Sequence, residues 1–250
     1  MLKFWRQVCL TPGEWFLNGE IKYTMNRMVI IFASLIGAIL GMGTNYLNQK
    51  LTQREEEATK PPLPKEIYWA PFLNAIFLGL AAYRWGFSVT GLVVSVVIVL
   101  LVQIFVFDAR HRLILNIIIY PAMLAALAFA YFNPLLFGEG FVKVWSAGLG
   151  ALLAGGIFLG LVIVSRGGLG LGDAKLVFFL GAILGVLPFP GSPILRALIY
   201  GICLGGIISV LLLLTRIRKM KDFIPYGPFL CLGGILVLLY PCGFGLGVSC

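Results

Sequence analysis

The chain has 250 residues, of which 60% are hydrophobic and 12% are charged, and its formal net charge is +9. A soluble domain of this length needs far more polar surface, so the composition excludes that class and predicts an integral membrane protein. The positive charge does not indicate a nucleic-acid partner, because the cations lie between apolar stretches, where they orient a chain in the bilayer.

Long apolar stretches recur along the chain and match the length that a helix needs to cross a hydrocarbon core of about 30 Å. They are continuous rather than alternating, which excludes a transmembrane β-barrel. We therefore predict an all-α fold, a polytopic membrane helix bundle of about eight transmembrane helices. The stretches lie near residues 28–45, 69–86, 88–107, 113–132, 144–164, 174–190, 194–214 and 227–247.

The chain before the first stretch has a different composition. It combines Trp5 and Trp15 with the cation Lys3, a mixture that suits the membrane interface. We therefore predict two regions. Residues 1–27 form an N-terminal interfacial or anchor segment, and residues 28–250 form one membrane-embedded domain.

The loops between the stretches differ in charge. With strict alternation of spans, three cation-rich loops fall on one side, together with the hydrophilic linker at residues 50–67. Cations concentrate on the cytoplasmic side of membrane proteins, so we predict that this side is cytoplasmic. The cations of these three loops are Arg110, Arg112, Arg166, Arg216, Arg218, Lys219 and Lys221. The opposite loops carry only Arg84, Lys143 and Arg196.

The first distinctive acidic residue, Asp108, closes an apolar span with the sequence QIFVFD. A carboxylate at the edge of a bilayer core costs free energy, which makes it a candidate functional group. The alternative is a surface salt bridge with Arg110 or Arg112, which contributes little. His111 is the only histidine of the chain, and it has no partner with which to build a catalytic triad.

The second acidic residue, Asp173, lies in the glycine-rich segment SRGGLGLGDAK at residues 165–175. Glycines here allow an extended substrate backbone to approach closely. A carboxylate directly after them is expected in the first turn of the next helix, where the helix dipole favours the anionic form. A flexible turn with a helix-capping aspartate is the structural alternative. A phosphate-binding loop fits less well, since no strand precedes the segment and no Lys-Ser/Thr pair completes it.

Two carboxylates on separate helices can share one proton and activate a water molecule, which is the chemistry of aspartic proteases. Asp108 and Asp173 are therefore the candidate catalytic residues. The five cysteines are scattered without a CxxC pair, so we predict no metal site and no cofactor. A disulfide between Cys242 and Cys250 is left open, on their proximity alone.

Three motifs occur in an order that resembles the type IV prepilin peptidases, which are GxGD intramembrane aspartic proteases related to the archaeal preflagellin peptidases. They are Asp108 at a span end, GLGLGDAK, and IPYGPFL at residues 224–230. The resemblance implies catalytic roles for Asp108 and Asp173. The residues that it implies as substrate-binding or site-supporting are Gly170, Gly172, Lys175, Pro225, Gly227, Pro228 and Asn45, the last in GMGTN, which looks like the family's GSFLN.

The resemblance also implies an activity. It is that of an aspartic endopeptidase that cleaves the basic leader peptide of prepilins or pseudopilins at the cytosolic membrane boundary. The expected location is the inner (plasma) membrane of a prokaryotic cell, with several spans and the active site facing the cytoplasm. The expected partners are these substrates and the lipid bilayer, with no nucleic acid, and no pattern in the chain indicates an oligomeric state.

Three features depart from the family's pattern. Longer members carry two CxxC pairs in a cytoplasmic domain linked to zinc binding and N-methylation, where this chain has only the linker at residues 50–67. We therefore expect a form with peptidase activity and without methyltransferase activity. The family's LPD segment is ILN here, with Asn116, and a glutamate typical of the second span is Asn74. These two changes alter accessory polar contacts and leave the aspartate pair intact.

Two other classes of protein share some of these features. An ion-coupled transporter also uses intramembrane carboxylates on broken helices, although near the middle of the membrane rather than at span ends. A catalytically silent pilus-assembly membrane protein would retain the fold. A signal-peptide peptidase is disfavoured, because FD stands where its YD motif is expected.

Overall fold

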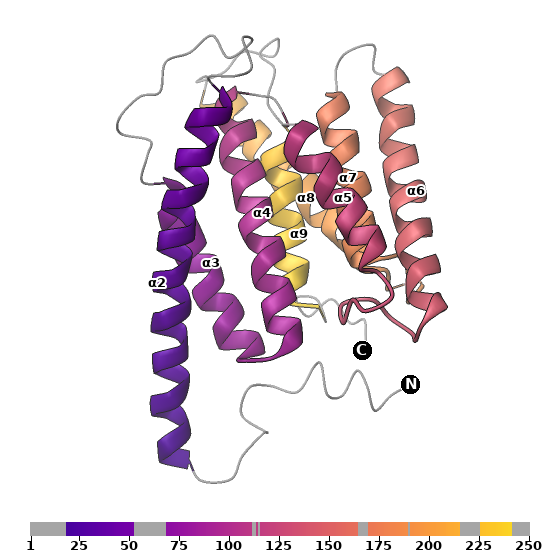
Figure 1. Cartoon of the computed structure of the whole chain (residues 1–250). Coiled ribbons are helices and arrows are strands. Elements are labelled where there is room, and N and C mark those ends of the chain that lie inside the picture. Colours follow the sequence, from indigo (N-terminus) through magenta and orange to yellow (C-terminus); the bar gives the residue numbers. More distant parts are fainter. Residues whose placement is uncertain are drawn as a thin grey trace. The chain divides into compact units, whose positions relative to one another are not determined.

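The computed structural model describes residues 19–52, 69–111, 114, 116–164, 170–189, 191–215 and 226–241. Every regular element in these ranges is a helix (Figure 1). The helices are α2 (Gly19–Thr52), α3 (Trp69–Trp85), α4 (Val89–His111), α5 (Asn116–Ala128), α6 (Phe141–Val164), α7 (Leu171–Leu184), α8 (Pro193–Leu214) and α9 (Gly227–Leu239). The predicted all-α class is confirmed, and each helix overlaps one of the predicted apolar stretches.

The lengths of the helices differ from those of the apolar stretches. Among the described residues, three helical segments are long and apolar enough to cross a membrane, namely Val89–Ala109, Phe141–Val164 and Pro193–Leu211. Other apolar helices, such as α5, are shorter. A hydropathy pattern cannot locate the end of a helix when the turn that follows it is also apolar. The turn at residues 129–136 after α5 is mostly apolar. The chain is therefore a membrane protein whose helices differ in length.

The helices divide into two compact units, one of residues 1–107 and 238–250 and the other of residues 108–237. In the first unit α2 packs along α3 (Figure 1). A Cβ at Gly37 would lie 2.7 Å from the backbone oxygen of Asn74, and a Cβ at Gly79 would lie 2.6 Å from Oγ of Ser34. Small residues at such contacts let helix backbones approach closely, which is how helices associate in lipid.

The second unit is built around α7, most of whose residues are buried. It packs against α5, α6 and α8. The contact with α6 is close between the backbones, because a Cβ at Gly150 would lie 2.6 Å from the carbonyl oxygen of Gly181. This contact sets the position of α7 beside α6.

A turn fixes the C-terminal end of α7. Gly185 has a φ of 69°, which favours glycine, and its N–H donates a hydrogen bond to the carbonyl of Gly181 at 2.9 Å. The next two residues are held by Ser146 of α6. Its carbonyl accepts from the N–H of Val186 at 3.1 Å, and its Oγ accepts from the N–H of Leu187 at 3.1 Å. These hydrogen bonds fix the position of α7 along the axis of α6. They thereby also fix the position of the first turn of α7.

The start of α9 is placed by α8. A Cβ at Gly201 would lie 3.0 Å from the Cα of Leu230 on α9, and a Cβ at Gly233 would collide with the carbonyl oxygen of Ala197 on α8. Close packing of this kind positions Gly227, the buried first residue of α9, within the second unit.

Candidate active site

Both predicted aspartates belong to the second unit, and both are buried. Asp108 lies in the last turn of α4, and its side chain is 4% exposed. Asp173 lies in the first turn of α7, as its position after the glycines predicted, and is 9% exposed. Aspartate is almost never fully buried without a partner, so the burial of both side chains needs a structural or functional reason.

Asp173 has identifiable partners. The N-cap residue of α7 is Gly170 rather than the aspartate. The backbone N–H of Asp173 donates to the carbonyl of Gly170 at 3.1 Å, and its carboxylate accepts backbone hydrogen bonds from Gly170 and Gly227. The hydrogen bond from Gly170 is one half of a capping box. Asp173 therefore does help to cap α7, as the alternative interpretation of the sequence proposed. The bond from Gly227 reaches a different helix, and capping does not account for it.

Gly227 is the residue at which the two carboxyl groups meet. A Cβ at Gly227 would collide with Oδ2 of Asp108 and would lie 3.1 Å from Oδ1 of Asp173. Two carboxyl groups that both approach the position of one Cβ lie close to each other. Among the described residues, no group forms a hydrogen bond with the buried Oδ2 of Asp108. The structure therefore brings together the two aspartates that the sequence separates by 65 positions.

The surroundings of the pair favour a single negative charge. The first turn of α7 and the first residue of α9 both direct backbone N–H groups at the carboxylate of Asp173. The N-terminal N–H groups of a helix carry positive partial charge and stabilise an anion. Two adjacent carboxylates oppose double ionisation. If the two carboxyl groups share one proton, the pair carries one negative charge. The N–H groups then stabilise that charge, and the repulsion between two carboxylates is avoided.

Lys175 links the first half of α7 to α5. Its Nζ donates a hydrogen bond to Oδ1 of Asn116 at 2.7 Å, and lies 5.0 Å from the centroid of the Tyr120 ring, within cation–π range. Both partners belong to α5. These contacts of Lys175 link α7 to α5 next to Asp173. Its role as a site-supporting residue stays a prediction.

The structure describes some of the other residues predicted for the site and not others. A Cβ at Gly172 would lie 3.1 Å from the Cβ of Ile114, so this glycine permits close contact with the chain before α5. Pro228 is buried at the start of α9. Pro225 and the side chain of Asn45 lie outside the described residues, as do residues 1–18, Cys242 and Cys250.

Asn74, which replaces the family's glutamate, belongs to the first unit. It is 0% exposed on α3, and among the described residues neither Oδ1 nor Nδ2 has a hydrogen-bond partner. A buried amide of this kind is costly in lipid as in a protein core. Its contribution to the activity remains a prediction.

Sequence reasoning missed Cys231 as a neighbour of the pair. It lies four residues after Gly227 on α9, is 0% exposed, and interacts electrostatically with both carboxyl groups. Residues four apart share a face of a helix. The spacing of four residues between Gly227 and Cys231 could therefore have indicated that Cys231 lies near the site.

The site thus contains two buried carboxyl groups and backbone N–H donors from two helix starts. Among the described residues, no group of three or more His, Cys, Asp or Glu side chains is placed to hold a metal ion. A carboxyl pair of this kind can hold a water molecule and act on it as acid and base.

The sequence around the pair matches a known family. Residues 93–210, which contain both aspartates, match the type IV leader peptidase family (Peptidase_A24). The chain carries a type IV leader peptidase domain. The resemblance drawn from the motifs is therefore confirmed. Gly227, which the motif IPYGPFL had indicated, lies outside the matched residues, and the structure places it beside both carboxyl groups.

Similar proteins bear the name prepilin leader peptidase/N-methyltransferase. That of Pseudomonas aeruginosa is 27% identical over 175 residues, which are 67% of this chain and 56% of the relative. That of Bacillus subtilis is 28% identical over 172 residues, 68% of this chain and 64% of the relative. The aligned part of the chain thus spans less than two thirds of these relatives. No solved structure gave a significant match.

Proposed function

We propose that the chain is an intramembrane aspartic endopeptidase that removes the basic leader peptide of type IV prepilins or pseudopilins. The observation that carries the proposal is the meeting of Asp108 and Asp173 at Gly227. The leader peptidase domain and the names of the similar proteins support the substrate class. A substrate of this class has a basic leader followed by an apolar helix, and the helix enters the bilayer beside the site.

The proposed reaction begins with a water molecule held between the two carboxyl groups. The ionised carboxylate removes a proton from the water, and the water oxygen forms a bond to the carbonyl carbon of the scissile peptide. The protonated carboxyl group donates its proton to the carbonyl oxygen at the same time. The product of this step is a neutral tetrahedral diol, and the two carboxyl groups have exchanged their protonation states.

The second step breaks the carbon–nitrogen bond. The carboxyl group that received the proton from water gives it to the leaving nitrogen, while the other carboxylate removes a proton from the diol. The products are a carboxylic acid and an amine, and the pair again holds one proton. The N–H groups of Gly170 and Gly227 support this cycle by stabilising the negative charge on Asp173.

The glycine-rich chain before α7 is the proposed contact for the substrate backbone. An extended peptide can approach glycine closely because no Cβ intervenes, and Gly170 lies directly at the carboxyl group, with its Cβ position 3.6 Å from Oδ2 of Asp173. Cleavage would therefore fall where the substrate leaves the membrane helix and becomes extended.

The proposed orientation places this chemistry at the cytoplasmic side of a prokaryotic plasma membrane. The cation-rich loops predicted by the sequence support it, because such loops remain in the cytoplasm. The test is a set of reporter fusions after residue 112 and after residue 221, which should both report the cytoplasm. A periplasmic signal from both would reverse the proposed orientation without affecting the aspartate pair.

The activity is tested by expressing the full chain with candidate prepilins from its own host and following the shift in mobility on removal of the leader. Asp108→Asn and Asp173→Asn should each abolish the shift, while the protein remains in the membrane. The matched control is Glu139→Gln, which changes an acidic residue in the turn before α6 and should leave processing intact. Complete processing by either asparagine variant would refute the proposed pair.

A further inference from the structure

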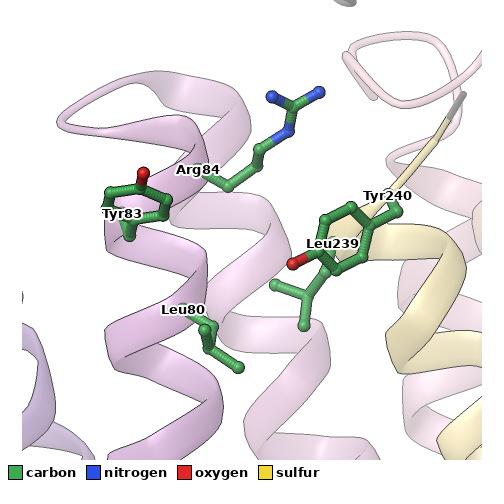
Figure 2. Close-up of a pocket in the computed structure, with 5 residues that line it drawn as sticks. All are labelled: Leu80, Tyr83, Arg84, Leu239 and Tyr240. Carbon is green, nitrogen blue, oxygen red and sulfur yellow. The ribbon is translucent and has the colours of Figure 1, made fainter. Parts of the chain in front are cut away.

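A cavity of about 210 Å³ lies within the first unit, where α3 and α9 end (Figure 2). The residues that line it are Leu80, Tyr83, Arg84, Leu239 and Tyr240. None of them belongs to the candidate active site. A water molecule takes about 30 Å³ in the liquid, so the cavity has room for a chemical group of several heavy atoms.

Hydrogen bonds hold the walls of this cavity in place. Nε1 of Trp85, at the end of α3, donates to the carbonyl of Leu238 on α9 at 3.0 Å. Gly86 has a φ of 58° and ends α3, and its N–H donates to the carbonyl of Ala82 at 2.9 Å. Both helix ends are thus fixed relative to each other, so the cavity exists before a ligand arrives, as binding sites for small molecules usually do.

The lining changes from charged to apolar along the cavity. Figure 2 shows the guanidinium group of Arg84 at one end, the side chain of Leu80 at the other, and Leu239 between them. Arg84 is half-buried, and among the described residues no carboxylate forms an ion pair with it. A ligand that matches this lining is negatively charged at one end and apolar at the other.

The aromatic residues around the cavity indicate its depth in the membrane. Tyr83 and Tyr240 are both exposed, and Tyr83 lies shortly before the turn at residues 86–88 that leads into α4. Aromatic side chains with polar tips gather at the level of the lipid headgroups. The span Val89–Ala109 begins directly after this turn. We therefore expect the cavity to lie at the boundary between the headgroups and the hydrocarbon.

We infer that this cavity binds an anionic glycerophospholipid, with its phosphate on Arg84 and the start of one acyl chain along Leu80 and Leu239. Guanidinium groups bind phosphate oxygens through paired, charge-assisted hydrogen bonds. The hydroxyl group of Tyr83 can donate to a remaining phosphate or ester oxygen. Free phosphate would leave the apolar half of the cavity unused, and a zwitterionic headgroup would bring a second cation next to Arg84.

The first test is native mass spectrometry of the full chain in detergent, titrated with phosphatidylglycerol or phosphatidylcholine of the same acyl composition. The wild-type chain should retain phosphatidylglycerol preferentially. Arg84→Gln should weaken that binding at least about tenfold, the factor expected from loss of one charge-assisted hydrogen bond, and Arg84→Lys should restore part of it. Lys143→Ala is the matched control, since this cation is predicted on the same side of the membrane and does not line the cavity.

Equal retention of both lipids by the wild-type chain would overturn the inference, as would equal losses in Arg84→Gln and Lys143→Ala. A second measurement needs no variant. A photoreactive phosphatidylglycerol is crosslinked to the wild-type chain, and the modified peptides are mapped. Crosslinks at residues 80–85 or 239–240 that phosphatidylglycerol competes away, and that inorganic phosphate and phosphatidylcholine do not, support the site. Crosslinks confined to other helices contradict it.

Discussion

Nζ of Lys175 donates a hydrogen bond of 2.7 Å to Oδ1 of Asn116, and this pair joins α7 to α5 across 59 positions of sequence. The resemblance to the family places an aspartate where this chain has Asn116. In this chain the contact is a hydrogen bond from the lysine amine to a neutral amide oxygen. The same Nζ also lies 5.0 Å from the centroid of the Tyr120 ring.

The first prediction concerns this pair. Asn116→Ala should lower the rate of prepilin processing about fivefold, because a net hydrogen-bond contribution of about 1 kcal/mol corresponds to that factor. Asn116→Asp should retain the wild-type rate, since an aspartate at this position accepts the same hydrogen bond. Rates from cleavage time courses with purified variants check both. A loss in Asn116→Asp equal to that in Asn116→Ala would contradict the supporting role of the pair.

The second prediction concerns Gly227. Gly227→Ala should lower the processing rate about 100-fold or more, because the new methyl group collides with Oδ2 of Asp108 and displacements of about 1 Å at a catalytic centre cost that much. The backbone of Gly227 has no positive φ, so alanine is conformationally acceptable and the effect is steric. The measurement is again a cleavage time course.

The control for Gly227→Ala is Gly156→Ala on α6. A Cβ at Gly156 has no atom within 4 Å among the described residues, so this variant should process prepilin at the wild-type rate. A Gly227→Ala variant that is as active as Gly156→Ala would show that the carboxyl groups do not meet at this glycine in the active protein.

The third prediction concerns the contact between α6 and α7. Gly181→Ala should lower the free energy of unfolding by about 1–3 kcal/mol, the usual cost of forcing an extra group into a packed contact, because its Cβ collides with the carbonyl oxygen of Gly150. Thermal unfolding in detergent measures this. Gly148→Ala, on the same helix as Gly150 and with open space at its Cβ, should be as stable as the wild-type chain or more so. Equal melting temperatures for the two variants would argue against the close contact.

The fourth prediction concerns the chemical state of the product. The similar proteins are named for a second, methyl-transferring activity, and the linker at residues 50–67 of this chain contains no cysteine. We expect the new amino terminus of the processed pilin to be unmethylated when purified chain, substrate and S-adenosylmethionine are combined. Mass spectrometry of the product decides this, since a methyl group adds a fixed mass. A methylated terminus would contradict the peptidase-only form.

Hydropathy predicted the helices well and their ends less well. Apolar runs located all eight described helices, because in a membrane protein the need to bury apolar surface in lipid dominates the sequence. The end of α7 could not be predicted in the same way. It depends on Gly185 and on hydrogen bonds from residues 186 and 187 to Ser146, which a local pattern does not contain.

The candidate site was predictable in part. Asp173 in a first turn follows from the glycines before it, and Asp108 at a span end follows from the cost of a carboxylate in lipid. That the two approach one glycine of α9 is a tertiary contact, and only the resemblance to the family indicated Gly227. The pairing of Lys175 with Asn116 and the nearness of Cys231 to the carboxyl groups were missed, because both depend on how separate helices pack.

The place of Gly227 in the last described helix has a consequence for biosynthesis. A ribosome making this chain completes both aspartates more than fifty residues before the glycine whose N–H bonds to Asp173. Until α9 has been made and has packed against α8, the nascent chain contains both aspartates but lacks the hydrogen bond from the N–H of Gly227 to Asp173. Under the proposed function, the surroundings of Asp173 would therefore be complete only after α9 has been synthesised and has packed against α8.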